Sequence, residues 1–303
     1  METADATVEL FADPRSFLAV AGRHLADAPV VNTVIATVAE RMARRLDERG
    51  DLPDLGYQLW WAVVRDASGL VVGTAMRTAP FPPHPIFVLP MPEAGARALA
   101  EVLRARGEVI EGANGALPAT RQLADELARD SGGRVEVVEQ TRLFELGTLV
   151  QPERTPPGRL RPMVAEEAEL GLAWFRAFHT EADEQAGRRP DPTQGEHFGL
   201  DDILERILDE RVFVWVDDEH RPLHLTAINN PAYGVNRVGP VYTPKEHRGN
   251  GYATAAVAEV SAGILRDGVR ACLFTDRANP VSNAIYQRIG YRAVTDMANL
   301  VIA

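Results

Sequence analysis

Cysteine is almost absent from this sequence of 303 residues. The single Cys272 cannot form an internal disulfide, and no Cys/His cluster has the spacing of a zinc site. Cys272 stands in the apolar stretch ACLF, which favours a buried strand residue over a nucleophile. We therefore expect neither a disulfide framework nor a bound metal ion.

Long apolar runs and an excess of positive charge are lacking as well. The longest apolar run, at 59–64, is much too short to span a membrane, and the opening METADATVELF has neither the basic start nor the apolar core of a signal peptide. The 43 acidic residues against 32 Lys and Arg give a formal net charge of −11, whereas a phosphate backbone requires a basic surface. We expect a cytoplasmic protein with no nucleic-acid and no membrane partner, whose acidity serves solubility or attracts cationic small molecules.

A weak internal repeat divides the chain near its middle. The stretch QPERTPPG at 151–158 carries three prolines and is typical of a linker. Three segments before it match three after it in the same order, at an offset near 155 residues: 62–75 with 213–227, 86–90 with 240–244, and 132–144 with 289–301. Such faint similarity also arises by chance between two α/β halves. We prefer a duplication, with domains at 1–150 and 159–303.

Apolar periodicity gives the second half the pattern of a mixed sheet. It predicts helices at 164–186, 199–210, 251–266 and 279–289, and strands at 211–217, 222–228, 236–243 and 270–275. The last segment of each half, at 132–144 and at 289–301, is expected to form two short strands after a glycine. This order favours an α/β or α+β fold with helices on both faces of the sheet.

The stretch HRGNGYATAAVAEV at 247–260 places two glycines and an arginine at the start of an alanine-rich helix. Small residues let successive backbone N–H groups point into one concavity, and the first N–H groups of a helix are unpaired. The helix dipole and the guanidinium of Arg248 add positive potential at the same place. We therefore expect a diphosphate site that requires no metal ion.

The spacing of this stretch excludes the two commonest nucleotide loops. The string G-x-x-x-x-G-K-[ST] does not occur, and Gly249-x-Gly251 is followed by Thr254 where a dinucleotide fingerprint requires a glycine or an alanine. What fits is R-x-x-G-x-[GA], as Arg248-x-x-Gly251-x-Ala253, preceded by the strand VGPVYTP.

Two later segments complete a family pattern. The strand ACLFTD leads to ANPVSNAIYQRIGY at 278–291. Together with the turn, these segments resemble the GNAT family of N-acetyltransferases over roughly 160–303, and over 1–150 the likeness rests on the repeat alone. The resemblance implies tandem GNAT-like domains, each with a mixed, mostly antiparallel sheet flanked by helices. The residues at places comparable to those of the family are Asn279, Asn283, Tyr286, Gly290 and Tyr291.

The resemblance implies acetyl-CoA as the cosubstrate. The coenzyme is expected in a splay between the strands at 238–243 and 270–275, beside a bulge that leaves one N–H free to polarise the thioester carbonyl. The pantetheine arm would lie along the backbone of the first strand, and the diphosphate on the amides of the turn. The coenzyme-binding residues so implied are Val241, Tyr242, Thr243, Arg248, Gly249, Asn250, Gly251, Tyr252 and Ala253.

The family's chemistry is a direct attack of the amine on the thioester, without an acyl-enzyme. Tyr286 resembles the tyrosine that protonates the leaving thiolate in many members; the alternative is a core tyrosine beside Ile285 and Ile289. Asn279 and Asn283 either orient the coenzyme arm or cap the helix that they begin.

The acceptor side offers several carboxylates. Glu181 and Glu184 stand three residues apart, so both lie on one helix face. They are candidates for a base or for binding a cationic amine, or they form a solvated face. Asp276 is a further candidate for the base, whereas His179 and His224 are expected to be structural.

The first half lacks the turn. At an offset of 154, the three fixed positions of the arginine–glycine motif fall opposite Ala94, Arg97 and Leu99 in the stretch PEAGARAL. Because that helix is expected without the glycines, we interpret Gly249 and Gly251 as serving a ligand rather than the turn, and expect one active site, in the second half. The chain is then an acetyl-CoA-dependent N-acetyltransferase acting on an amine of a small molecule. The alternative is a non-catalytic acyl-CoA-binding sensor.

Overall fold

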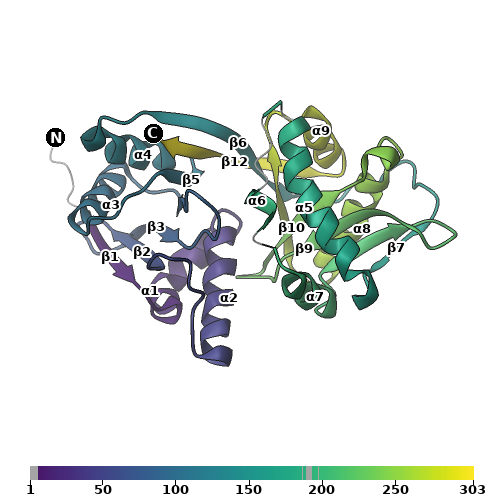
Figure 1. Ribbon diagram of the computed structural model, residues 1–303, viewed down its shortest axis with the longest axis horizontal. Helices are drawn as coiled ribbons and strands as arrows, with labels where there is room; N and C mark the ends of the chain where they lie inside the picture. The colour runs from purple at the N-terminus through teal and green to yellow at the C-terminus, as the bar shows by residue number, and fades with distance from the viewer. Residues whose placement is uncertain (1–5, 186, 189–192, 197) are drawn as a thin grey trace. The chain divides into compact units, whose positions relative to one another are not determined.

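The chain forms two compact units (Figure 1). The structure is a computed structural model that describes residues 6–185, 187–188, 193–196 and 198–303. Unit 1 comprises Met1–Arg142 and Thr295–Ala303, and unit 2 comprises Leu143–Val294. These units divide the chain at other places than the expected domains 1–150 and 159–303, because the proline-rich stretch 151–158 lies inside unit 2.

The strands of unit 1 form a mixed sheet in the order β1–β2–β3–β4–β5. The first four strands pair antiparallel, and β4 pairs parallel with β5. Asp13 begins the first helix because its side chain accepts a hydrogen bond from the N–H of Arg15 at 2.8 Å. The elements are β1 (Thr7–Phe11), α1 (Pro14–Asp27), α2 (Thr33–Arg49), β2 (Trp60–Arg65), β3 (Val71–Arg77), β4 (Ile86–Val88), α3 (Glu93–Ala105), β5 (Gly112–Ala116) and α4 (Ala119–Ser131).

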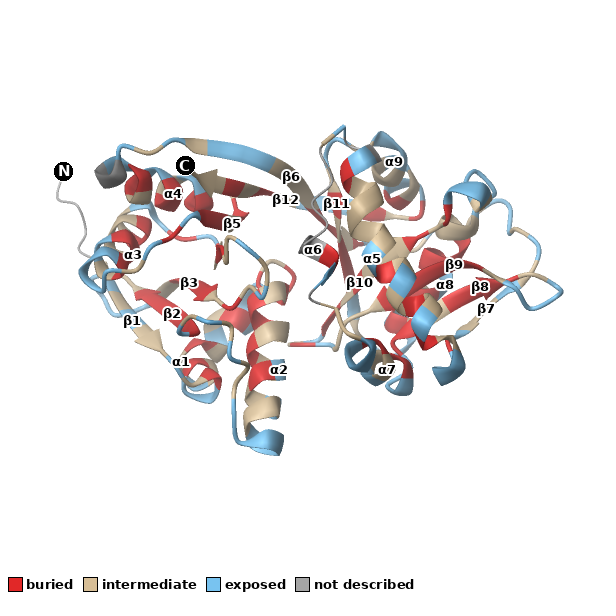
Figure 2. Ribbon diagram, in the orientation of Figure 1, coloured by how far each residue is buried: buried red, intermediate tan, exposed pale blue. Residues whose placement is uncertain are grey.

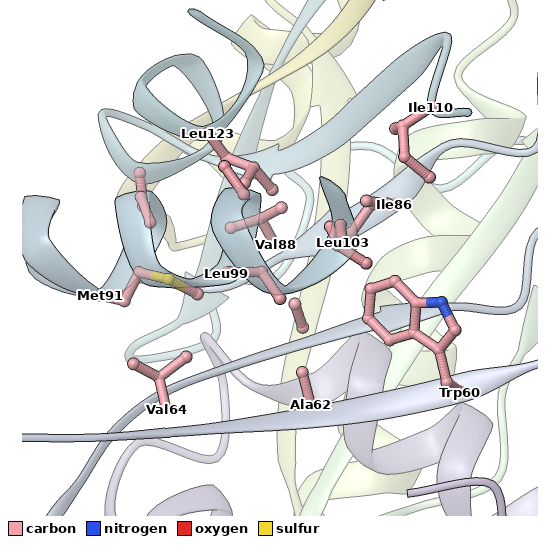
Figure 3. Packing of buried hydrophobic residues seen from close by; sticks show 14 residues of the cluster. Trp60, Ala62, Val64, Ile86, Val88, Met91, Leu99, Leu103, Ile110 and Leu123 are labelled. Atoms are coloured by element: carbon pink, nitrogen blue, oxygen red, sulfur yellow. The ribbon is translucent and has the colours of Figure 1, made fainter. Parts of the chain in front are cut away.

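Helices cover both faces of this sheet. Figure 3 shows one face, where Trp60, Ala62 and Val64 of β2 meet Leu99 and Leu103 of α3 in a buried cluster. Successive strand residues point to opposite faces, so the neighbouring Trp61 lies on the other side. There its ring is 6.5 Å from the ring of Phe17 in α1. The continuous apolar run at 59–64 is therefore a strand buried on both faces.

Unit 2 repeats this arrangement. Its strands follow the order β11–β10–β9–β8–β7, with the parallel pair between β10 and β11 and antiparallel pairing elsewhere. Each helix and strand predicted between 164 and 289 is present within a few residues of its expected ends, whereas β7 and the short α6 were not predicted. The elements are β7 (Arg159–Pro162), α5 (Ala168–Gln185), α6 (Thr193–Glu196), α7 (Leu200–Leu208), β8 (Val212–Val216), β9 (Pro222–Ile228), β10 (Val235–Tyr242), the 3₁₀ turns η1 (Ala165–Glu167) and η2 (Lys245–His247), α8 (Tyr252–Arg266), β11 (Arg270–Asp276) and α9 (Pro280–Arg288).

The central strands of unit 2 are also buried on both faces, as the red ribbons of β8 and β9 indicate (Figure 2). Val214 and Leu225 belong to a cluster with Phe175 of α5 and Ile203 of α7. On the opposite face Trp215 packs against the start of α8. The expected mixed, mostly antiparallel sheets flanked by helices are thus confirmed.

Two long strands, β6 (Val135–Leu146) and β12 (Tyr291–Ile302), run from one unit into the other. The prediction of two short strands in each of these segments is wrong, because each forms one continuous strand. The end of β12 pairs antiparallel with β5, with Leu300 opposite Ala113. The end of β6 is the neighbour of β11. Each half of the sequence therefore supplies the last strand to the sheet of the other unit, which explains why 151–158 is not the boundary between the units.

This exchange predicts where a core substitution at the end of the chain acts. Leu300 is buried against Ala113 and Ala124, so Leu300→Ala should lower the free energy of unfolding by about 2–4 kcal/mol. The matched change Leu208→Ala, at a side chain that is 73% exposed, should alter it by less than about 0.5 kcal/mol. Hydrogen exchange should locate the loss of protection in β5 and α4. An equal loss in β8 and β9 would contradict the assignment of β12 to the core of unit 1.

Candidate functional site

The parallel strands β10 and β11 separate before they end. Their pairing runs from Val235 opposite Arg270 to Val238 opposite Leu273, although β10 continues to Tyr242. Between Val238 and Val241 the register with β9 moves by three residues on β10 and by two on β9. The extra residue is a β-bulge at 239–240. The expected splay and bulge are therefore both present in this stretch of the described chain.

The corresponding strands of unit 1 stay together. β4 and β5 are paired along the whole of β4, and a Cβ added to Gly115 would lie 2.0 Å from the carbonyl oxygen of Val88. Helix α3 then begins directly after Pro92, without a glycine turn. This close contact leaves no opening between β4 and β5.

The arginine–glycine turn follows β10 and leads into α8. Gly249 and Gly251 have φ of +81° and +86°, in the left-handed region that favours glycine. A Cβ built on either glycine would have no atom within 4 Å. The backbone of the turn therefore accounts for the glycines by itself, which corrects the interpretation that they serve a ligand rather than the turn. The open space around both residues remains available to a ligand.

No side chain caps the first turn of α8 among the described residues. By contrast, Asp13 caps α1, and Asn279 caps α9 by accepting a hydrogen bond from the N–H of Ser282 at 3.1 Å. The first N–H groups of α8 follow Gly251, beside Arg248. Unpaired N–H groups at a helix start, with the helix dipole behind them, form an environment that suits an anion.

Arg248 is held from two sides. Its Nε donates to the carbonyl oxygen of Thr243 at 3.0 Å, and its guanidinium forms an ion pair with Glu181 of α5. The hydroxyl of Tyr242 donates to the other carboxylate oxygen of Glu181 at 3.1 Å. Burial, together with the nearby charge of Glu181, raises the pKa of Tyr242 to about 12.

The second glutamate of α5 also contacts this region. Lys245 in the 3₁₀ turn donates to Glu184 at 2.8 Å, and both side chains are largely exposed. Glu181 thus faces the arginine–glycine turn, whereas Glu184 lies on the solvated surface in an exposed ion pair. Sequence spacing placed the two on one side of a helix, but nothing in the sequence indicated which side of the helix meets the turn.

His224 lies beneath the start of the turn. Its Nδ1 is 2.7 Å from Oγ1 of Thr243, and its Nε2 is 2.7 Å from Oγ1 of Thr226. The side chain is fully buried, and burial lowers the pKa of the imidazole to about 3. The ring is therefore neutral and links β9 to Thr243, the residue whose carbonyl oxygen accepts the hydrogen bond from Arg248. The alternation His224-x-Thr226, which places both side chains on one strand face, was the signal that could have found this link.

Tyr286 is buried in α9, within the core cluster that contains Ile289 and Tyr291. Burial raises the pKa of the Tyr286 hydroxyl well above its usual range, so the group stays protonated at neutral pH. Among the described residues its hydroxyl has no hydrogen-bond partner, whereas that of Tyr291 lies 2.8 Å from Oγ of Ser261. The amide of Asn283 donates to the carbonyl oxygens of Asp276 and Asn279.

Asp276, at the end of β11, is paired rather than available as a base. Arg188 donates to it at 2.6 Å and also pairs with Asp183 at 3.0 Å. Cys272 is a buried residue of β11, as expected. His179 of α5 stacks on the ring of Phe198.

Neither a metal site nor a membrane-spanning helix is found among the described residues. No group of three or more His, Cys, Asp or Glu side chains there is placed to hold a metal ion. None of the helices in the described part of the chain has the length and apolar character to cross a membrane.

The backbone of the turn predicts opposite effects of two glycine substitutions near one helix. Gly251→Ala forces alanine into the left-handed region and should lower the free energy of unfolding by about 1–2 kcal/mol. Gly263→Ala, within α8 and without steric conflict, should raise it by about 0.5–1 kcal/mol. Chemical denaturation measures both values. If both changes proved stabilising, the left-handed assignment at Gly251 would be wrong.

The neutral His224 predicts a dependence of stability on pH. The unfolded chain binds a proton at this residue below about pH 6.5, whereas burial holds the folded pKa at about 3. The contribution of His224 to the free energy of unfolding is therefore complete above about pH 6.5. As the pH falls below that value, the contribution decreases by about 1.4 kcal/mol per pH unit. The difference in unfolding free energy between the wild type and His224→Asn should shrink accordingly between about pH 6 and 4. A constant difference would show that the imidazole is charged in the folded protein.

Comparison with known families gives a match in the second half of the chain. Residues 225–299 match the sequence model of a family described as FR47-like protein. This GNAT-related segment includes the bulge of β10, the arginine–glycine turn and α9, and it covers less than half of the chain. A search of proteins with curated descriptions found no match.

Several solved structures are similar over nearly the whole chain. A GCN5-related N-acetyltransferase from Sphaerobacter thermophilus is 19% identical with a TM-score of 0.55, over 99% of this chain and 95% of that chain. A Drosophila protein is 15% identical with a TM-score of 0.64, over 98% of each chain. A tandem GNAT protein from the clavulanic acid biosynthesis pathway is 15% identical with a TM-score of 0.50, again over 98% of each chain. At these identities the likeness concerns the fold, and the chain thus has the tandem fold of the GNAT acetyltransferases with an FR47-like segment at 225–299.

Proposed function

We propose that the protein is an acetyl-CoA-dependent N-acetyltransferase that moves the acetyl group directly to an amine of a small molecule. The observation that carries the proposal is the separation of β10 from β11 at the bulge, followed at once by the turn into α8. An extended arm and a diphosphate are the two parts of coenzyme A that such a combination would accommodate.

The turn supplies the diphosphate site. The uncapped first N–H groups of α8 and the guanidinium of Arg248 offer hydrogen-bond donors and positive potential. Positive φ at Gly249 and Gly251 lets the backbone curve around an anion, and no side chain fills the space where their Cβ atoms would stand. Asn250, Tyr252 and Ala253 would contribute backbone donors to the same concavity.

The end of β10 supplies the site for the pantetheine arm. Beyond Val238, the edge of β10 that faced β11 has lost its partner strand, so backbone groups near Val241 and Thr243 would pair with the amides of the arm as an added strand does. The bulge would aim one N–H at the thioester carbonyl, which stabilises the charge that develops on its oxygen. Acetyl-CoA supplies the acyl group when bound.

The transfer needs two proton movements. An alkyl amine, with a pKa of about 10, first loses a proton to solvent. The neutral amine then attacks the thioester carbon, the C–S bond breaks, and the proton that the nitrogen gives up on forming the amide balances the one that the thiolate takes up. Tyr286 is the donor in this proposal, because its phenol is protonated at neutral pH and no described residue accepts a hydrogen bond from its hydroxyl. Asn279 and Asn283 cap and brace α9, so they act here through the position of Tyr286.

A small-molecule amine is the proposed acceptor, and the cytoplasm is the proposed location. The acidic balance of the chain suits cationic amines. The lone, buried Cys272 is typical of a compartment in which thiols stay reduced.

Calorimetry with coenzyme A tests binding, and release of free thiol tests turnover. The wild type should bind acetyl-CoA, and should release thiol on addition of at least one amine of a panel such as spermidine, kanamycin and leucinamide. Absence of binding below millimolar concentration would refute the proposal, and binding without thiol release would make the protein a sensor.

Tyr286→Phe tests the proton donor. It should lower kcat about 10- to 100-fold and change coenzyme affinity less than about twofold. Tyr291→Phe is the matched control: its ring lies 6.1 Å away in the same cluster, and loss of its hydrogen bond to Ser261 should affect stability rather than turnover. Equal kcat in the wild type and Tyr286→Phe would make Tyr286 a packing residue.

A further inference from the structure

Arg248 has an anionic partner within the protein itself. Glu181 reaches it from α5 and forms an ion pair with the guanidinium, and the side chains of Arg248 and Glu181 are 34% and 18% exposed. The same carboxylate accepts a hydrogen bond from the hydroxyl of Tyr242. One carboxylate thus contacts both the end of β10 and the arginine of the turn.

This ion pair is not needed to hold the arginine near the turn. The Nε of Arg248 is already bonded to the carbonyl oxygen of Thr243, which anchors the guanidinium from the side of the backbone. Glu181 instead engages a terminal nitrogen, the part of the fork that binds phosphate oxygens. The Glu181 carboxylate therefore occupies the guanidinium nitrogen of Arg248 to which a diphosphate would bind.

We propose that Glu181 is an exchangeable internal anion of the coenzyme turn. The diphosphate of the coenzyme replaces the Glu181 carboxylate on Arg248. The released carboxylate, still bonded to Tyr242, then binds the ammonium group of the acceptor amine. This inference rests on the proposed function and adds to it the class of acceptor, a cationic alkyl amine, and the group that recognises it.

The exchange couples the two ligands. A largely buried carboxylate that loses its cationic partner is unfavourable unless another cation replaces it, and the neutral hydroxyl of Tyr242 cannot do so. An alkyl amine carries a positive charge at neutral pH and is such a cation. Binding of the coenzyme therefore increases the affinity of the site for the amine, and the reverse holds by linkage.

Coenzyme A affinity, measured by calorimetry, tests the first step. In Glu181→Gln the competing charge is absent, so coenzyme A should bind about threefold to tenfold more tightly than to the wild type. Glu181→Ala removes the whole carboxylate side chain, so this variant should also bind coenzyme A more tightly than the wild type does. Glu169→Gln makes the same change of charge at an exposed position in the first turn of the same helix, and its affinity should stay within about 1.5-fold of the wild type.

A double-mutant cycle assigns the effect to Arg248. In an Arg248→Gln background there is no guanidinium for Glu181 to occupy, so adding Glu181→Gln should leave coenzyme affinity unchanged. Equal or weaker binding by both single Glu181 variants would overturn the inference, and binding by the wild type would at the same time leave the proposed function standing. Absence of binding to the wild type would overturn both.

The acceptor step has its own measurement. With the panel amine that the wild type turns over fastest, Glu181→Gln should raise the KM of the amine about tenfold while coenzyme affinity rises. These opposite changes for the two ligands are not expected of a residue that only braces the fold. An unchanged KM for the amine would overturn the assignment of Glu181 to the acceptor.

Discussion

The candidate site depends on the place where the parallel strands β10 and β11 stop pairing. β10 and β11 separate beyond Val238 and Leu273, where the bulge at 239–240 turns the backbone of β10 away from its neighbour. The exposed strand edge, the turn and the free start of α8 all follow within a few residues along the chain. In unit 1 the equivalent strands remain in contact at Val88 and Gly115, and no such turn follows them.

A network of polar contacts holds the side chains of Arg248 and Glu181 beside the separated strands. Buried, neutral His224 joins β9 to Thr243, Thr243 accepts a hydrogen bond from Arg248, and Arg248 pairs with Glu181. This network runs from a buried imidazole in the sheet to a partly exposed ion pair at the turn. Because the carbonyl oxygen of Thr243 anchors Arg248, the arginine can stay in place while its charged partner changes.

The sequence predicted the parts of the site whose signal is local. The motif Arg248-x-x-Gly251-x-Ala253, the strand before it and the helix with Tyr286 are contiguous patterns, and the structure has these elements within a few residues of the expected bounds. The roles of these residues in binding and transfer stay predictions. The positive φ of the glycines is a backbone property that the motif alone did not separate from ligand contact.

What the sequence missed depends on contacts between distant segments. Glu181 and Arg248 meet because α5 packs beside the end of β10, and no periodicity encodes that meeting. The proline-rich stretch at 151–158 looked like a domain boundary, whereas the exchange of β6 and β12 moves the boundary to Arg142 and Val294. Pairing of β12 with β5 joins residues far apart in sequence, which local patterns do not specify.

A structure with bound acetyl-CoA tests the central claim most directly. The account predicts the pantetheine arm between β10 and β11 beyond Val238, the diphosphate on the amides of 248–253, and the thioester sulfur facing the hydroxyl of Tyr286. A coenzyme bound elsewhere, with β10 and β11 unchanged and the turn empty, would contradict it.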